Sequence, residues 1–254
     1  MQLSDLRLAV RPRSAYEAMD VGIRLVQTEA GLLYRVWFAV TLPVLLLVLA
    51  LITLTGNKLA YLLLWWLKPL YDYALLIVLS RRVFGATPRL RDVLLTLAGS
   101  WRHGLIGFLG WRRLSMSRAY LLPVWLLENL PGRERNARIA LLRNGQTGRA
   151  RWLHIVMVHF ETIMLLTGIS LLFWFAPESH FASLWDQLTK GSADAFVPVA
   201  QTLAYFMAIS LIEPFYVAAG FALYLNRRTE LEAWDLELAF RHLRERLDVR
   251  QVNP

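Results

Sequence analysis

The sequence predicts an all-α integral membrane protein, a single helical bundle with about four transmembrane helices and additional interfacial amphipathic helices. Apolar residues make up 56% of the 254 positions. Several apolar runs reach the roughly 18–20 residues that cross about 30 Å of hydrocarbon. Arginines gather between and beside these runs, which is typical of loops on one side of a membrane. We therefore treat residues 1–254 as one membrane domain.

Four runs are long enough to span a membrane. The first, from Trp37 to Thr55, has no charged residue, and Pro43 is its only irregularity. A tight turn at Gly56-Asn57-Lys58 follows, so the first two spans should form an antiparallel hairpin. The predicted spans are residues 36–55, 59–83, 153–174 and 197–225.

Residues 1–35 are predicted to form a cytoplasmic or interfacial arm. Ser14 follows Arg11-Pro12-Arg13 and is a suitable N-cap, and apolar residues then recur at i+3/i+4 spacing as far as Leu33. This amphipathic helix either lies in the cytoplasmic interface or packs on the protein's own loops.

Residues 84–152 form a basic cytoplasmic region, which we interpret as several interfacial pieces. Short helices are expected from Pro88 to Leu97 and from Arg133 to Leu142. The run from Gly104 to Gly110 is too short to span. Its three glycines permit close backbone approach, or a shallow re-entrant or interfacial turn. Whether residues 104–127 enter the bilayer is left open by the sequence.

Residues 226–254 are predicted to form a separate cytoplasmic helix. Thr229-Glu-Leu-Glu232 matches a capping box, which would start a new helix after the last span. Apolar residues then follow two opposite sides as far as Leu247, which favours a partner on one of them.

The charge distribution sets the expected orientation. The net charge is +9, and residues 81–152 alone hold 14 arginines and three acidic residues. Four spans with both termini in the cytoplasm place every arginine-rich segment on the cytoplasmic side. Anionic lipid at that face explains the basic charge better than nucleic acid does.

Ionisable residues interrupt three of the four spans near their centres. Lys68, Pro69 and Asp72 lie in the second span, Glu161 in the third and Glu213 in the fourth. A charge at the bilayer centre costs about 2.5–3.5 kcal/mol on insertion scales, so neighbouring helices must bury these groups. Lys68 and Asp72 can pair at i, i+4. Pro69 should free the carbonyl of Trp65.

The polar faces of the spans should meet as an intramembrane polar cluster. His154 shares a helix face with Glu161, and Tyr205 and Ser210 fall in the same broad sector as Glu213; these three are possible peripheral members. One lysine faces three carboxylates. One or two of the acids should therefore be protonated or pair with another cation such as an arginine.

No enzymatic motif is visible. The sequence lacks G-x-S-x-G, a P-loop, G-x-G-x-x-G and H-E-x-x-H. The absence of cysteine excludes disulfides, iron–sulfur clusters and a cysteine nucleophile. We expect no catalytic residue, no metal site and no cofactor. The cluster then fixes helix packing, or docks onto polar groups of a partner membrane subunit, or serves proton- or cation-linked transport or lipid binding.

Several strings together carry a resemblance. They are residues 11–20 (RPRSAYEAMD), 66–72 (WLKPLYD), 78–81 (VLSR), 111–115 (WRRLS) and 213–237, which begins EPFYVAAGFALYLNRR. The chain resembles a family of multi-pass inner-membrane proteins of Gram-negative bacteria. Members of that family occur beside a MoxR-type AAA ATPase and von Willebrand factor A-type proteins. The C-terminal part is also distantly similar to the membrane domain of some glycerophosphodiester phosphodiesterases.

The resemblance implies a bacterial inner-membrane component with protein partners in such an ATPase system, and it transfers no catalytic residues. We therefore expect a non-enzymatic scaffold or assembly subunit of a multi-protein membrane system. The alternative is a small transporter or lipid-handling protein that uses the acidic cluster.

Overall fold

The computed structural model describes residues 11–99, 107, 109–128, 130–145, 147–175, 185–186 and 196–233. In these ranges the regular elements are helices, with no strand, which confirms the predicted all-α class. The elements are α1 (Ala15–Thr55), 3-10 helix η2 (Lys58–Tyr61), α2 (Leu62–Trp66), α3 (Lys68–Val83), α4 (Leu90–Gly99), 3-10 helix η4 (Trp111–Leu114), α6 (Arg118–Leu126), α7 (Gly132–Arg143), α8 (Thr147–Trp174) and α10 (Phe196–Glu232).

Four helical segments are long and apolar enough to cross a membrane, as the sequence predicted. They are Ala15–Thr55, Lys58–Val83, Thr147–Leu171 and Phe196–Glu232. The first and the last are much longer than the predicted spans, because each continues into a polar segment that was expected to be separate. Lys58–Val83 consists of η2, α2 and α3, with α2 and α3 meeting at Leu67.

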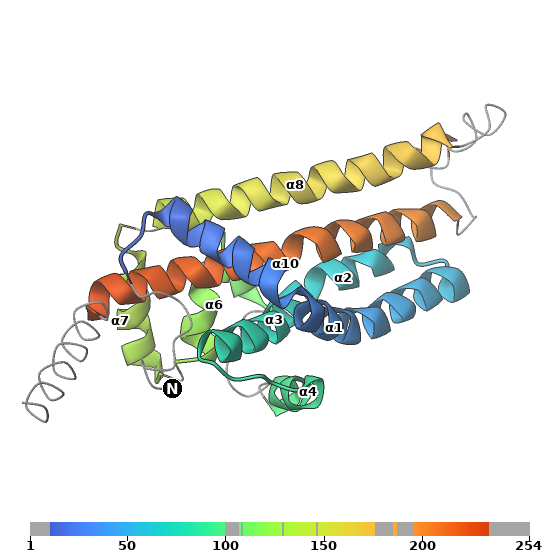
Figure 1. Ribbon diagram of the computed structural model, residues 1–254. Coiled ribbons are helices and arrows are strands. Elements are labelled where there is room, and N and C mark those ends of the chain that lie inside the picture. The colour runs from blue at the N-terminus through green and yellow to red at the C-terminus, as the bar shows by residue number, and fades with distance from the viewer. Residues whose placement is uncertain are drawn as a thin grey trace, which may run out of the picture.

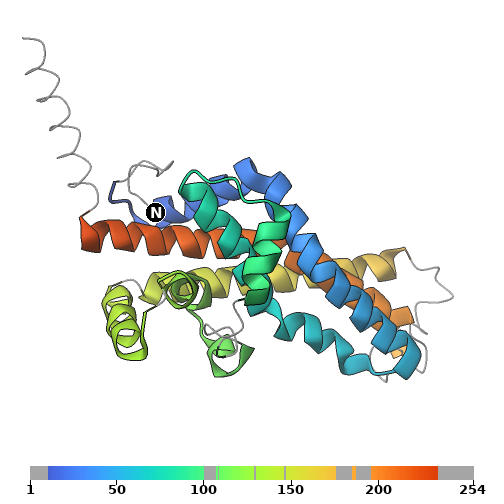
Figure 2. The ribbon, with the colours of Figure 1, turned by 90° about the horizontal axis from the view of Figure 1, so that it is seen from below.

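Helix α10 runs through the middle of the molecule and contacts α1, α8, α6 and α3 (Figures 1 and 2). Small residues make these approaches close. A Cβ added at Gly22 of α1 would lie 2.5 Å from the carbonyl oxygen of Ala218, and one at Gly220 would collide with Ala119 of α6. The run from Ala218 to Gly220 is therefore the point where α1 and α6 both reach the α10 backbone.

The amphipathic arm and the first span form one continuous helix. Ser14 caps α1 as predicted, its side chain accepting a hydrogen bond from the backbone N–H of Glu17. The buried face of the arm packs against α10, so the arm is covered by a helix of the bundle and not by loops. Asn226 of α10 fixes the start of the arm through two hydrogen bonds to the backbone of Arg13, of 2.9 and 3.0 Å.

The second span breaks where the sequence contains its lysine and proline. Leu67 ends α2, and Pro69 lies in the first turn of α3, where its fixed φ and missing N–H are tolerated. The predicted free carbonyl was that of Trp65. In the structure it is the carbonyl of Trp66, one residue later, that accepts a hydrogen bond from a side chain. The donor is Arg113 Nη1, at 3.1 Å.

The expectation of interfacial pieces between residues 84 and 152 holds only in part. Helices α4 and α7 match the predicted short helices, but α6 is buried from Arg118 to Trp125. Its contacts are mainly with α10. With only nine residues, this segment was too short to be predicted as a core helix. It is one nevertheless, because Gly220 allows α6 to approach α10 closely. Most of residues 100–108 lie outside the described part of the chain.

The predicted capping box at Thr229 is wrong. Helix α10 continues through this position, and the Thr229 hydroxyl donates a 3.0 Å hydrogen bond back to the carbonyl of Leu225. Glu232 instead pairs with Arg228 and Arg138. The two apolar strips expected toward Leu247 lie almost wholly outside the described residues.

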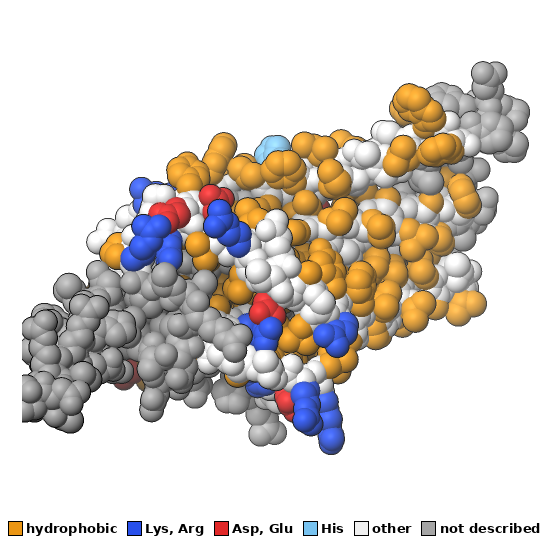
Figure 3. Space-filling view, viewed as in Figure 1, with side chains coloured by type: hydrophobic (Ala, Val, Ile, Leu, Met, Phe, Trp, Pro, Cys, Tyr) orange, Lys and Arg blue, Asp and Glu red, His pale blue; other side chains and the backbone are white. Residues whose placement is uncertain are grey.

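The surface divides into two parts. In Figure 3 the visible Lys, Arg, Asp and Glu side chains gather near the start of α1 and beside α4. Hydrophobic side chains cover the helices toward the other end. Their exposed members include Leu46 and Leu54 on α1, Ile163 on α8 and Met207 on α10. This division matches an apolar belt with a charged region on one side.

The close contact at Gly22 leads to a stability prediction. Gly22→Ala should lower the free energy of unfolding by about 1–3 kcal/mol, because the methyl group would overlap the α10 backbone. Gly31→Ala is the matched control in the same helix, with nothing within 4 Å of the added Cβ. It should be neutral or raise stability by up to about 1 kcal/mol. Thermal unfolding in detergent measures both; equal effects would contradict the packing described.

Candidate functional site

The structure brings the predicted polar residues together at the junction of three helices. Lys68 and Asp72 project from the first turns of α3, Glu161 from α8 and Glu213 from α10. Lys68, Asp72 and Glu213 are 5%, 0% and 2% exposed, so the group is shielded from solvent and from the lipid-facing surface. We call these four residues, with Arg118 described below, the polar centre.

Lys68 links α3 to both of the other helices. Its Nζ lies 2.6 Å from Oε2 of Glu161 and 2.7 Å from Oε2 of Glu213. The predicted pairing of Lys68 with Asp72 within one helix does not occur. The lysine side chain reaches across to α8 and α10, and Asp72 has a different cation.

That cation is Arg118, the first residue of α6. Its Nε lies 2.8 Å from Oδ2 of Asp72, and its Nη2 donates a 2.7 Å hydrogen bond to Oε1 of Glu213. A planar guanidinium can serve two carboxylates at once, which an ammonium group on a flexible chain does less specifically. From the sequence, two outcomes were open: protonated acids, or a further cation such as an arginine. The structure places such a cation, Arg118, which belongs to the segment predicted as interfacial.

A second arginine of the same segment lies beside the polar centre. Arg113 in η4 is 4% exposed, and its guanidinium carbon lies 3.7 Å from the centre of the Trp65 ring. Together with its bond to Trp66 O, this contact places η4 against the break in the second span. Three carboxylates therefore face Lys68 and Arg118 directly and Arg113 nearby, so the region is close to neutral when every group is ionised.

The peripheral residues connect the polar centre to α1 and α6. His154 Nδ1 lies 2.9 Å from the hydroxyl of Tyr216, which also accepts a 3.3 Å hydrogen bond from the backbone N–H of Ala119. Ser210 Oγ accepts a 2.9 Å hydrogen bond from Nε1 of Trp37. The Tyr205 hydroxyl is buried and has no hydrogen-bond partner among the described residues.

Sequence reasoning missed Trp37, Arg118 and Tyr216. For Arg118 a signal was present, since an arginine immediately before an apolar strip can be carried inward with that strip. For Trp37 and Tyr216 there was no such sequence signal, because both look like ordinary apolar positions of a span.

The polar centre lies nearer the arginine-rich end of some helices than of others. Glu161 is ten residues after Arg151 and thirteen before Trp174, close to the middle of α8. On α1, however, the residue that reaches the same level is Trp37, only two residues after Arg35. The helices are therefore staggered. The common depth was predicted only for the second, third and fourth spans, and the first span meets the polar side chains nearer to its arginine-rich segment.

A second ion network joins α6, α7 and α10 at the arginine-rich end. Arg138 lies 3.1 Å from Glu128 and also pairs with Glu232, and the Tyr224 hydroxyl donates a 2.5 Å hydrogen bond to Glu128. Burial alone would lower the pKa of Arg138, but hydrogen bonds and charge interactions with Glu232 and Glu128 outweigh it and raise the pKa. The α6–α7 region is thus anchored to α10 at both ends.

The arrangement is suited to holding helices together. Each carboxylate of the polar centre already has a cation within 3 Å. In the part of the chain that the structure describes, no three His, Cys, Asp or Glu residues are grouped so that they could hold a metal ion. Comparison with protein-family models, curated proteins and solved structures returns no match for this chain.

The polar centre predicts an order of mutational effects. Glu213→Gln removes a charge that both Lys68 and Arg118 contact, and should cost about 3–5 kcal/mol of stability. Glu161→Gln should cost less, because Glu161 is 13% exposed and Lys68 keeps Glu213. The exposed Glu134→Gln is the control and should change stability by less than about 0.5 kcal/mol. Unfolding of the purified variants in detergent tests the order; equal losses for Glu161 and Glu213 would refute it.

Proposed function

We propose that this protein is a non-enzymatic scaffold or assembly subunit of a multi-protein system in the bacterial inner membrane. In this proposal the polar centre holds the helices of the bundle together. Helix α8, which the other helices leave largely uncovered, binds a membrane-embedded partner. The observation that carries this proposal is the exposure of α8.

Helix α8 is covered on one side only. It packs mainly against α10, with a smaller contact to α6. Almost none of its apolar window is buried, whereas most of the corresponding window of α10 is. Phe160, Ile163 and Leu166 are about half exposed along its outer side. Lipid alone can cover such a side, so the polar residues on it decide the interpretation.

The outer side of α8 also carries polar groups. His159, Thr162 and Ser170 are exposed there, and Figure 3 shows histidine surrounded by hydrophobic side chains along this helix. His159 and Thr162 bond back to the carbonyls of Ile155 and Val158 at 2.7 and 2.9 Å. An imidazole still has its second nitrogen free for a partner. Polar and small residues on such a face are typical of helix–helix contacts within membranes.

The polar centre supports a structural role for the charged residues. Lys68 and Arg118 place a cation within 3 Å of each of the three carboxylates, and the four ion pairs join α3, α6, α8 and α10. Side chains that tie four helices together in this way have a structural task whether or not they bind a substrate. This supports assigning a structural role to Lys68, Asp72, Glu161 and Glu213.

The cellular placement rests on charge and on resemblance. The arginine-rich end would face the cytoplasm and its anionic lipids, with both termini on that side. The family that the chain resembles supports the bacterial inner membrane and partners in a MoxR-type ATPase system.

Photo-crosslinking tests the partner on α8. A photoreactive residue at Ile163, which is 53% exposed, should crosslink to a second protein in intact membranes. The same residue at Leu46 of α1, which is 65% exposed and equally apolar in its surroundings, should crosslink only to lipid. Gel shifts and mass spectrometry of the products measure both. Lipid adducts alone at both positions would contradict a docking role for α8.

One observation favours the second candidate, a small transporter or lipid-handling protein. A cavity of about 450 Å³ opens between η2, α2, α8 and α10, is mostly apolar, and is lined in part by Tyr205 and Gln201. The Glu213→Gln variant separates the candidates. A transporter would lose flux in proteoliposomes while staying folded, whereas a structural centre loses folded protein.

A further inference from the structure

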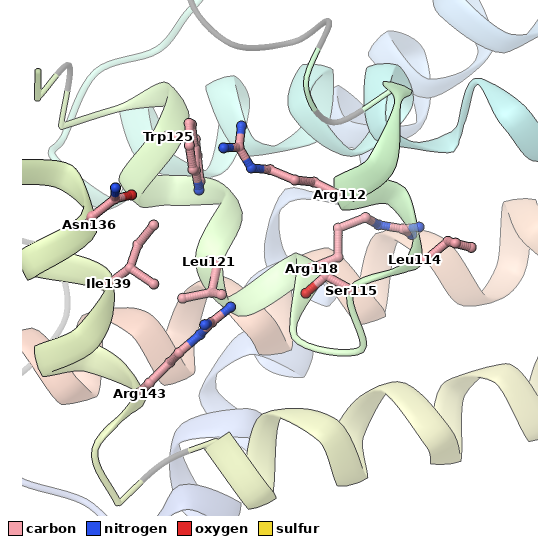
Figure 4. A pocket seen from close by; sticks show the side chains of 9 residues that line it. All are labelled: Arg112, Leu114, Ser115, Arg118, Leu121, Trp125, Asn136, Ile139 and Arg143. Atoms are coloured by element: carbon pink, nitrogen blue, oxygen red, sulfur yellow. The ribbon is translucent and has the colours of Figure 1, made fainter. Parts of the chain in front are cut away.

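A second cavity lies on the other side of the polar centre, between η4, α6 and α7. Its volume is about 420 Å³, and three arginines line it: Arg112, Arg118 and Arg143. Figure 4 shows the guanidinium of Arg112 beside the Trp125 ring and that of Arg143 extending toward Leu121, while the Arg118 guanidinium points away from Trp125. None of the described residues that line this cavity is acidic. Its charge therefore favours an anion.

The arginines at this cavity differ in whether their charge is balanced. Arg118 is neutralised by Asp72 and Glu213. Arg112 and Arg143, by contrast, make no ion pair with any carboxylate in the described part of the chain.

A third unbalanced cation lies close by. Arg135 stacks on the same indole as Arg112, with guanidinium carbons 3.8 and 3.4 Å from the centre of the Trp125 ring. Burial lowers the pKa of Arg112, and the charge of Arg135 lowers it further. Two like charges held against one ring, with no carboxylate partner among the described residues, are stabilised by an anion bound between the segments that carry them.

The rest of the cavity wall is mixed, with the polar side chains of Ser115 and Asn136 and several apolar ones. Leu121 and Ile139 line it beside the arginines, and Leu114 at its edge is 68% exposed. Met116, two residues farther along, is 52% exposed. A soluble phosphate needs no such surface, but the acyl chain of a lipid does.

The position of the cavity fits a lipid headgroup. At one end is Arg118, whose side chain enters the polar centre among the apolar helices. At the other end is Arg143, the last residue of α7 in the charged part of the molecule. The cavity thus extends between the apolar belt and its arginine-rich border, where the phosphates of a bilayer leaflet lie.

We infer that this cavity binds the phosphate group of an anionic phospholipid, with Arg112 and Arg143 as its ligands and Leu114 and Ile139 against the acyl chain. The inference rests on the membrane placement proposed above, and on no particular partner of α8. According to this inference, the arginine-rich loop binds one specific lipid molecule. A general electrostatic attraction to the membrane surface would not require such a site.

Lipid titration of the full chain tests this site. The purified, delipidated protein in detergent is titrated with phosphatidylglycerol, with phosphatidylcholine and with inorganic phosphate, and native mass spectrometry counts bound molecules. The wild type should retain one phosphatidylglycerol at least tenfold more tightly than phosphatidylcholine. Arg112→Gln with Arg143→Gln should abolish that preference, because both exposed ligands are lost while Arg118 is kept.

The matched control removes two exposed arginines that do not line the cavity, with Arg91→Gln in α4 and Arg133→Gln in α7. It should bind like the wild type. Melting curves check that both double variants are folded. If the cavity variant melts at a lower temperature, Arg143→Gln alone carries the test, with a loss of at least threefold expected.

Three results would overturn the inference: equal affinity of the cavity variant and the control, no preference between the two lipids, or inorganic phosphate binding as tightly as phosphatidylglycerol. The last would identify a site for a soluble phosphate compound. Recovery of the chain in the membrane fraction is measured separately. Its absence there would count against the proposed function, whereas a membrane-bound chain without lipid preference would count against this site alone.

Discussion

A carboxyl group buried among apolar helices must be either protonated or paired with a cation, and the pairing seen here decides where the segment between α3 and α7 lies. Asp72 and Glu213 are almost completely buried, and Lys68 alone cannot neutralise them together with Glu161. The remaining charge comes from Arg118, which enters the bundle at the start of α6. Leaving either carboxylate unpaired would cost several kcal/mol. The most basic loop of the chain is therefore also part of its core.

The packing around α10 makes this entry possible. Gly220 allows the backbone of α6 to approach α10 directly after the residue that carries the guanidinium, and Gly22 allows α1 to do the same from the other side. Arg113 fills the break at Leu67 by bonding to the carbonyl of Trp66. Because the segment between α3 and α7 folds into the bundle, Arg112 and Arg143 lie at the outer side of α6. The arginine-lined cavity forms there. The polar centre and the cavity are thus two consequences of one folded-back segment.

The sequence predicts what depends on composition and local periodicity. The four long apolar helices, the cap at Ser14 and the convergence of Lys68, Asp72, Glu161 and Glu213 follow from run lengths and from the cost of buried charge. Three features depend on tertiary contacts and were not predicted. Arg118 belongs to a strip too short and too close to other arginines to be identified as core. Lys68 bonds across helices and not to Asp72. The capping-box pattern at Thr229 does not start a new helix, because α10 packs against neighbouring elements and stays helical through this position.

A double-mutant cycle between Asp72 and Arg118 tests the central claim most directly. Asp72→Asn and Arg118→Gln are made singly and together, and the free energy of unfolding is measured in the same detergent. If the two side chains pair in the bundle, each single change should cost about 3–5 kcal/mol. The double variant should then be more stable than the sum of the two losses by about 2 kcal/mol or more. Losses that add to within about 0.5 kcal/mol would show that Arg118 does not balance Asp72, and would contradict the account.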